Sequence, residues 1–186
     1  MARFSVVLDA CVLVPVVLAD TLLRVAERGV LRPLWSERIL GEAMDAICEV
    51  HPTIDTELVT RRLLAMATTV EDATIAGWEP LEQDVVLPDP NDRHVVAVAL
   101  RAGAQAIVAS NVRDFPESAL KAFGLEAIHP DEFLLDELEL APKVVLEVLA
   151  GQAAHTTRPP LTPSDLLVRL ARAGVPGFAD EVARLL

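Results

Sequence analysis

Two patterns of hydrophobic and polar positions alternate along the first 130 residues. Phe4–Leu8 and Ala106–Ala109 are short apolar runs with β-branched residues, which is typical of strands buried on both faces of a parallel sheet. Leu31–Trp35 and Leu125–Ile128 predict further short extended segments, and Thr74–Trp78 is a weaker candidate strand. Between these runs, apolar residues recur at helical spacing. The alternation predicts an α/β fold with a mostly parallel sheet.

Start and stop residues mark the predicted helices. Pro15 and Gly29 bracket the first helix, and Ser36 is a candidate N-cap for the second. Gly103 closes a strongly apolar helix that opens after the turn-forming run Asp89–Asp92. The other predicted helices are Glu37 to about Glu49, Asp55–Thr68, a short one that ends at Gly124, Pro142–Ala154, and two within 164–186.

The pattern changes near Ala141. The chain has 186 residues, rich in Ala, Val and Leu and without Tyr, which suits one domain with a small appendage. We therefore expect an α/β domain over residues 1–141 and a helical C-terminal extension over 142–186, with a Thr- and Pro-rich linker at 155–163.

The cysteines and the hydropathy pattern bear on location. Cys11 and Cys48 lie in apolar stretches without CxxC spacing, so we expect free thiols and a reducing cytoplasm. No apolar run approaches 18 residues without a charge, so no membrane span is expected. The chain enters a strand-like run at once, and no signal peptide is expected.

The chain is acidic, with 28 acidic residues against 16 basic ones and a net charge of −12. This balance argues against a broad, nonspecific nucleic-acid binder, which would be basic. A protein that gathers carboxylates around a metal ion partly escapes the objection, because the ion reverses the local field.

Several of the acids are predicted to meet at one edge of the sheet. Asp9 ends the first strand, Asn111 and Asp114 follow the Ala106–Ala109 strand, and Asp92 and Glu42 lie near helix starts. Ligands of open α/β sheets bind beyond the carboxyl ends of the strands. Carboxylates gathered there repel one another unless a cation lies among them, and hard oxygen ligands select Mg²⁺ or Mn²⁺. Such an ion can activate water for phosphodiester hydrolysis.

Three segments give the chain a resemblance to the PIN domain over roughly its first 140 residues. They are VVLDACVLV, WSERILGE and DPNDRHVVAVALRAGAQAIVASNVRDF, in this order. The resemblance implies a three-layer sandwich in which helices flank a central, mostly parallel, short-stranded sheet. It makes Asp9, Glu42 and Asp92 the first three acids and places the fourth between Asn111 and Asp114.

The chain looks most like toxins of the VapC type. That resemblance implies an endoribonuclease that uses Mg²⁺ or Mn²⁺ on RNA, often structured RNA such as tRNA, a cognate antitoxin partner, and a homodimer. The C-terminal stretch resembles an extension carried by a subgroup of these proteins. At three positions, Cys11, Ala109 and Asn111, the chain departs from the residues that are common in proteins of this type. We expect Asp114 to carry the fourth charge and Asn111 to supply a neutral oxygen or a hydrogen bond, which leaves a second metal position open.

Other polar residues have simpler interpretations. Asp89 is expected to form a turn, and Trp35 and Trp78 are expected in the core. The histidines lack zinc spacing and are expected at the surface or as helix caps: His51, His94, His129 and His155. Seven arginines are candidate phosphate contacts: Arg24, Arg28, Arg38, Arg61, Arg62, Arg93 and Arg113. Arg93 and Arg113 are favoured because they flank proposed site residues.

The sequence is also compared with what a phosphatase, a thiol-dependent enzyme and a non-catalytic binding module would require. A phosphatase with Asp9 as covalent nucleophile usually needs a second Asp two residues on and a nearby Lys, but residue 11 is Cys and the only lysines are Lys121 and Lys143. Cys11 as a thiol nucleophile lacks a recognisable basic partner. A non-catalytic module that kept the fold stays open, because the fourth acid is divided and the chain is acidic.

Overall fold

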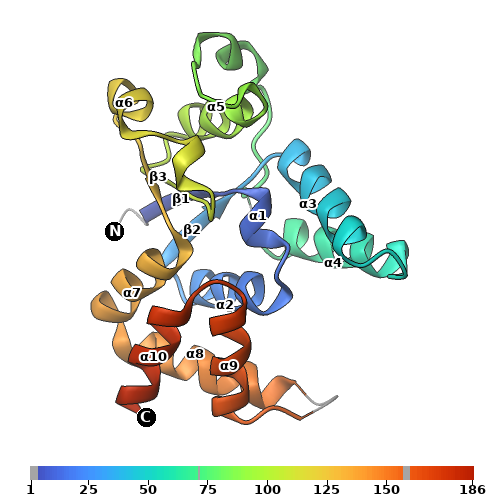
Figure 1. Ribbon diagram of the computed structural model, residues 1–186, viewed down its shortest axis with the longest axis vertical. Helices are drawn as coiled ribbons and strands as arrows, with labels where there is room; N and C mark the ends of the chain where they lie inside the picture. The colour runs from blue at the N-terminus through green and yellow to red at the C-terminus, as the bar shows by residue number, and fades with distance from the viewer. Residues whose placement is uncertain (1–3, 71, 157–159) are drawn as a thin grey trace.

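A computed structural model describes residues 4–70, 72–156 and 160–186. Its centre is a four-stranded parallel sheet in the order β2-β1-β3-β4 (Figure 1). The strands are β1 (Phe4–Leu8), β2 (Leu31–Leu34), β3 (Ala106–Val108) and β4 (Glu126–Ile128). Pro33 lies in β2, and an edge strand tolerates proline because its outer N–H needs no partner. The predicted parallel sheet is confirmed.

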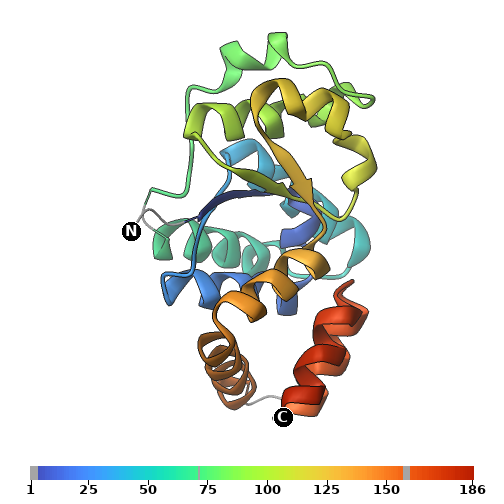
Figure 2. The same ribbon diagram turned by 90° about the vertical axis from the view of Figure 1, so that its left-hand side faces the viewer.

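Helices cover both faces of the sheet. α5 and α6 lie on one side and α2 on the other, while α3 and α4 pack together beside α1 (Figures 1 and 2). This arrangement confirms the three-layer α/β sandwich. The helices are α1 (Ala10–Leu13), α2 (Val16–Glu27), α3 (Glu37–Val50), α4 (Thr56–Thr69), α5 (Arg93–Ala102), α6 (Glu117–Leu120), α7 (Pro130–Leu140), α8 (Pro142–His155), α9 (Pro163–Arg172) and α10 (Pro176–Leu185). Short 3₁₀ helices are η1 (Glu79–Asp84), η2 (Pro90–Asp92), η3 (Val112–Asp114) and η4 (Lys121–Phe123).

The strand order places a reversal in winding between β1 and β3. From β1 the chain runs outward to β2 and then returns past β1 to β3, so the direction of winding reverses between these two central strands. Their carboxyl ends are therefore the topological switch point, where open α/β sheets bind ligands. The last residues of both strands are fully buried, so a ligand at this edge of the sheet would meet the residues that follow them.

The predicted strand at Thr74–Trp78 is wrong. Thr74 makes only an isolated bridge with Trp35, formed by Ile75 N donating to Trp35 O at 2.8 Å and Trp35 N donating to Ala73 O at 3.0 Å. Gly77 then takes a positive φ of 73°, which turns the chain out of the extended direction and into η1.

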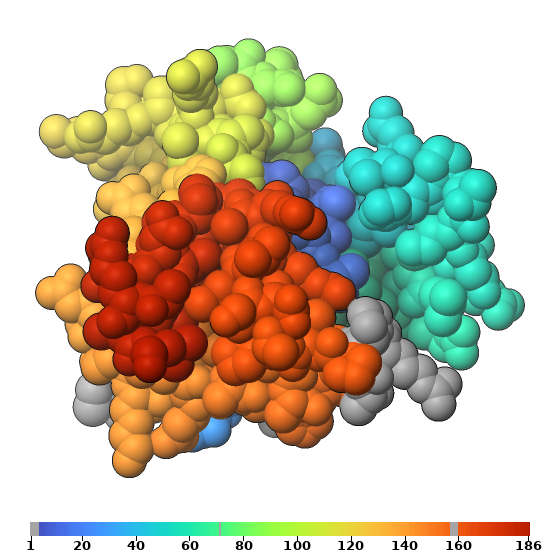
Figure 3. Space-filling view, turned by 60° about the horizontal axis from the view of Figure 1, so that its bottom comes forward, coloured from blue at the N-terminus to red at the C-terminus, as the bar shows by residue number. Residues whose placement is uncertain are grey.

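The C-terminal helices pack closely on the rest of the molecule, and α9 and α10 cover one face beside α8 (Figure 3). A buried polar contact fastens α8 to α2: the Thr21 hydroxyl lies 2.8 Å from Oε1 of Gln152, whose amide donates to Val17 O at 3.0 Å. Asp131 in α7 caps α10 by accepting from Gly177 N at 3.0 Å and Phe178 N at 2.8 Å. These helices confirm the predicted helical segments after Pro142.

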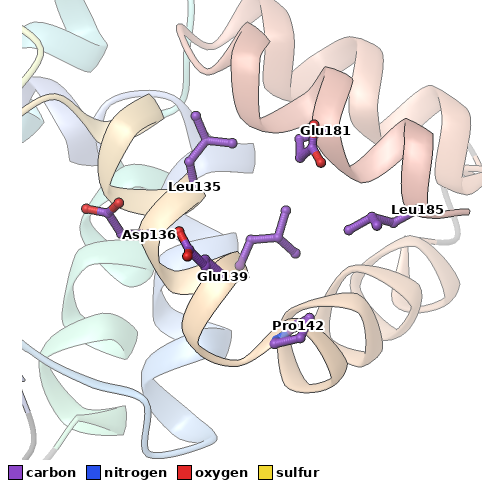
Figure 4. A pocket seen from close by; sticks show the side chains of 7 residues that line it. Leu135, Asp136, Glu139, Pro142, Glu181 and Leu185 are labelled. Carbon is purple, nitrogen blue, oxygen red and sulfur yellow. The ribbon is translucent and has the colours of Figure 1, made fainter.

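A cavity of about 420 Å³ lies between α7, α8 and α10 (Figure 4). Leucine and proline side chains line it together with carboxylates of Asp136, Glu139 and Glu181. Residues 157–159 of the predicted linker lie outside the described residues, and the domain boundary after Ala141 stays a prediction. Among the described helices, none is long and apolar enough to cross a membrane.

Candidate active site

Asp9 stands where β1 leaves the sheet. Its backbone N–H donates to Val108 O at 3.0 Å, which continues the pairing of β1 with β3 by one residue. Its backbone is extended and its side chain makes no capping hydrogen bond to α1, although it directly precedes that helix. The side chain is only 6% exposed. A buried carboxylate with no helix to cap is costly unless a cation or other donors stabilise it.

Asn111 and Asp114 occupy the corresponding place after β3. The Asn111 amide donates to Oδ2 of Asp114 at 2.8 Å. The Cys11 thiol, two residues after Asp9, lies 3.5 Å from Asn111 Oδ1 and accepts from Ser110 N at 3.2 Å. The ends of β1 and β3 are therefore joined by side-chain contacts, as the shared sheet edge predicted.

Asp92 lies in the electrostatic field of this group. Burial and then the charges of Asp9, Asp89 and Asp114 raise the pKa of Asp92 from 3.8 to about 6, against a smaller opposing effect of His94. Like charges act this way only at short range, so the acids after β1, after β3 and before α5 form one cluster. Asp89 caps η2 by accepting from Asn91 N at 2.8 Å, which confirms its predicted turn role.

The thiol of Cys11 is unsuited to nucleophilic attack. Burial, the charge of Asp9 and a hydrogen bond to that carboxylate raise the pKa of Cys11 to about 12. The reactive species of a cysteine is the thiolate, which is negligible at neutral pH for such a group. Cys11 therefore serves as a neutral contact for Asn111, and both cysteines are free thiols.

Glu42 is engaged by two basic side chains. Its Oε1 lies 3.2 Å from Nε of Arg38, one turn earlier in α3, and 3.0 Å from Nε2 of His94 in α5. Burial raises the pKa of Glu42, but His94 and Arg38 outweigh that effect and hold the pKa below its ordinary value. Glu42 is not among the charges that act most strongly on Asp92, so it lies at the margin of the acid cluster.

His94 is the neighbour of Glu42 that the sequence did not reveal. It was expected at the surface or as a cap, and that expectation is wrong: its side chain is 1% exposed and packs on Trp78, with ring centroids 5.8 Å apart. The i, i+4 spacing of Arg38 and Glu42 was a visible signal for their ion pair, but nothing in the spacing pointed to His94. His129 does cap α7, accepting from Asp131 N at 3.2 Å.

Most of the candidate phosphate-binding arginines are already engaged. Arg24, Arg28 and Arg38 form ion pairs with Asp20, Glu147 and Glu42 respectively. Arg62, on α4, donates to the Leu13 carbonyl at 2.7 Å. Arg113 is exposed and Arg93 is half-buried, and neither forms an ion pair among the described residues. Arg61 donates to the Glu57 carbonyl at 3.4 Å and likewise forms no ion pair among the described residues. Arg93 and Arg113 differ from it in that they directly follow Asp92 and directly precede Asp114 in the chain.

Comparison with protein families decides the classification. The model of the PIN domain matches residues 5–113, which is more than half of the chain and contains Asp9, Glu42, Asp92 and Asn111. This chain belongs to the PIN-domain family. The structure agrees with that assignment, because the matched range contains β1–β3, the first three strands of the sheet, and most of the acid cluster at their carboxyl ends.

Two further matches concern the relatives of this PIN domain. The VapC50 C-terminal domain matches residues 130–184, which cover α7 to α10. The chain is 44% identical over 94 residues to "Putative ribonuclease VapC50" of Mycobacterium tuberculosis (strain ATCC 25618 / H37Rv). That stretch is 50% of this chain and 55% of the relative, so the chain spans about half the length of the curated relative it matches. No solved structure matches the chain.

The donor chemistry of the PIN domain's acid cluster fits a divalent cation. Asp9 is buried and makes no capping hydrogen bond to α1, and burial and then the charges of neighbouring carboxylates raise the pKa of Asp92. Both observations describe hard oxygen donors that lack a positive partner. Within residues 4–70, 72–156 and 160–186, however, no three His, Cys, Asp or Glu side chains are arranged so that they could hold a metal ion.

Proposed function

We propose that this chain is a Mg²⁺- or Mn²⁺-dependent endoribonuclease that acts in the cytoplasm as the toxin of a type II toxin–antitoxin pair. The observation that carries the proposal is the uncompensated acid cluster at the switch point, expressed in the raised pKa of Asp92. Membership of the PIN-domain family and the similarity to a protein named as a ribonuclease support RNA as the substrate.

The proposed ligands are the carboxylates of Asp9, Glu42, Asp92 and Asp114, with Asn111 in support. A bound divalent ion would supply an activated water and stabilise the leaving oxygen of a phosphodiester. Asp9 offers a buried carboxylate fixed by the pairing of β1 with β3, so its position does not depend on a mobile loop.

The fourth ligand position is proposed to work as a pair. The Asn111 amide holds Oδ2 of Asp114 at 2.8 Å, and Cys11 contacts the amide oxygen of Asn111. This chain of contacts fixes the rotamer of Asn111 and directs its NH₂ group toward Asp114. Asp114 then carries the charge and Asn111 orients it.

The remaining parts of the proposal concern the substrate and the partners. Arg93 and Arg113 are proposed to contact phosphates, because their positive charges lie beside Asp92 and Asp114 and have no carboxylate partner among the described residues. By resemblance to VapC-type toxins, the substrate is proposed to be structured RNA such as tRNA, the partner a cognate antitoxin, and the assembly a homodimer. Residues 1–141 would form the nuclease domain and 142–186 its extension.

Digestion of total RNA under metal control tests the activity. The wild-type protein is expected to cleave RNA with Mg²⁺ or Mn²⁺ and to stop when EDTA is added. Asp9→Asn should lose cleavage because it removes one ligand charge, whereas Asp45→Asn, an exposed acid on α3, should cleave normally. Full cleavage by Asp9→Asn in the absence of metal would overturn the proposal.

A non-catalytic PIN-fold binding module is the second candidate. The observation that favours it is that no group of three acids or histidines in the described part of the chain is arranged to hold a metal ion. Isothermal titration with Mn²⁺ separates the two candidates. Heat of binding that disappears in Asp9→Asn supports the nuclease, and no binding at the acid cluster supports the binding module.

A further inference from the structure

Two basic side chains hold one of the two carboxylate oxygens of Glu42. Nε of Arg38 and Nε2 of His94 both approach Oε1, at 3.2 and 3.0 Å. Within the described part of the chain, no hydrogen bond or ion pair reaches Oε2. A carboxylate clamped at one oxygen presents the other in a restricted set of directions, which favours a ligand that binds through a single oxygen.

Arg38 is itself fixed at its far end. One terminal nitrogen lies 3.1 Å from Oε1 of Glu82 in η1, and the other donates to the Asn91 carbonyl at 3.4 Å. Asn91 directly precedes Asp92 and lies in η2. The guanidinium therefore joins α3 to the short segment that carries Asp92, and it keeps Glu42 and Asp92 in a set relation.

His94 is fixed by packing rather than by hydrogen bonds. Its ring is 1% exposed and tilted by 53° against the ring of Trp78. Its Nε2 approaches Glu42 at an ion-pair distance without the alignment of a hydrogen bond, and its buried Nδ1 has no partner among the described residues. Burying a polar ring without hydrogen bonds costs free energy of folding. This cost indicates that the contact between His94 and Glu42 serves a purpose other than stability.

We propose that Arg38 and His94 are positioning residues that clamp Oε1 of Glu42 and leave Oε2 as the oxygen for the divalent cation. This inference rests on the proposed function, because it requires a cation at the acid cluster. Neither residue is placed in contact with the cation or the RNA, and both act through Glu42. Outer partners of metal-ligating groups typically change metal affinity about 10- to 100-fold when they are removed.

The direction in which the affinity for the cation changes in an Arg38 variant shows whether Arg38 acts by positioning Glu42 or only through its positive charge. Loss of the positive charge of Arg38 makes the surroundings of the acids more negative, and by Coulomb's law this alone strengthens the binding of a cation. Loss of the clamp lets the Glu42 side chain rotate away, and this weakens the binding. The two explanations predict changes of opposite sign in the same measurement.

Titration of the full chain with Mn²⁺ alone, by calorimetry at neutral pH, tests the clamp. Arg38→Gln and His94→Gln are each expected to weaken Mn²⁺ binding by about 10- to 100-fold, and Glu42→Gln by a similar factor. Arg38→Lys should restore part of the affinity, because it keeps a charged donor. The matched control is Arg24→Gln, which breaks the i, i+4 ion pair with Asp20 at 2.9 Å on another helix and should leave binding unchanged.

Each result bears on one of two claims. Affinity that is unchanged or tighter in Arg38→Gln, or an equal loss in Arg24→Gln, overturns the clamp. His94 is buried; if His94→Gln does not fold, the Mn²⁺ affinity of Arg38→Gln tests the clamp alone, because Arg38 is half-exposed. A wild-type protein that binds no Mn²⁺, or binds it equally well as Asp9→Asn, overturns the proposed function and the clamp with it, which distinguishes that failure from failure of the clamp alone.

Discussion

Asp92→Asn should stabilise the metal-free protein even though it removes a proposed ligand. Burial and the charges of Asp9, Asp89 and Asp114 raise the pKa of Asp92 from 3.8 to about 6. Asparagine has nearly the same shape without the charge, so the substitution removes both the cost of burying the charge and the repulsion. The side chain of Asp92 makes no capping hydrogen bond to α5, so the substitution breaks no such bond.

The size of the gain follows from the pKa change. A rise from 3.8 to about 6 corresponds to roughly 3 kcal/mol at about 1.4 kcal/mol per pK unit. Asp92 is partly exposed, so solvent screens the repulsion, and we expect a gain of about 1 kcal/mol in the free energy of unfolding.

The pH dependence has a definite sign. The folded protein binds the proton of Asp92 more tightly than the unfolded chain does, so wild-type stability falls as the pH rises from about 4 to about 6. Below this window the carboxyl is neutral in both states, and above it the repulsion is fully present. The advantage of Asp92→Asn should therefore vanish near pH 4 and reach its full size above pH 6 to 7.

Urea unfolding in EDTA across this pH range measures the effect. Wild type and Asp92→Asn are compared with Asp45→Asn, an exposed acid on α3 that should behave like wild type at every pH. If the stabilities of Asp92→Asn and wild type run parallel across the range, or if the variant is less stable at high pH, the carboxylates do not form the repulsive cluster described above.

Three further predictions concern the C-terminal helices. Gln152→Ala should lower the free energy of unfolding in urea by about 1–3 kcal/mol, because it removes two hydrogen bonds, one with the Thr21 hydroxyl and one with the Val17 carbonyl; a loss below about 0.5 kcal/mol would contradict the role of this contact between α2 and α8. Asp131→Ala should lower stability by about 1–2 kcal/mol and Asp131→Asn by less, because Asp131 accepts from two N–H groups at the start of α10; equal losses on thermal unfolding would contradict the cap. Burial and then the charge of Asp136 raise the pKa of Glu137 to about 7. Glu137→Gln should therefore be more stable than wild type above about pH 7 but not below about pH 4. Urea unfolding that shows no such pH dependence would contradict this prediction.

Local rules explain why the sheet and most helices were predictable. Buried parallel strands need continuous apolar runs, and Phe4–Leu8 and Ala106–Ala109 have no competing helical pattern. Helix ends were equally clear where glycine takes a left-handed backbone: Gly103 has φ 62° and Gly124 has φ 66°, conformations that residues with a Cβ rarely adopt. In these segments local preference and tertiary packing agree.

The misses arose where tertiary packing decides. Thr74–Trp78 has the composition of a strand, but only Thr74 reaches a partner before Gly77 turns the chain. α7 went unpredicted because its acids and leucines give only a weakly one-sided pattern, with Glu137 itself buried. Its position is fixed by long-range contacts, among them the cap that Asp131 provides to α10.

The acid cluster was predictable from topology, whereas its surroundings were not. Parallel strands end at the same edge of a sheet, so Asp9 and the Asn111–Asp114 segment had to come close once β1 and β3 were neighbours. The contact of Glu42 with His94 depends on how α3 and α5 pack, which spacing along the chain does not encode. A histidine two residues after a proposed ligand was therefore interpreted as surface, although it lies in the core.

The distribution of positive charge bears on how so acidic a chain could hold RNA. The net charge is −12, and carboxylates already neutralise Arg24, Arg28 and Arg38 in ion pairs. These arginines therefore add little positive potential to the surface near the acids. Under the proposed function, the bound cation together with Arg93 and Arg113 would attract a phosphate at the acid cluster, so binding of RNA and binding of metal would depend on neighbouring residues.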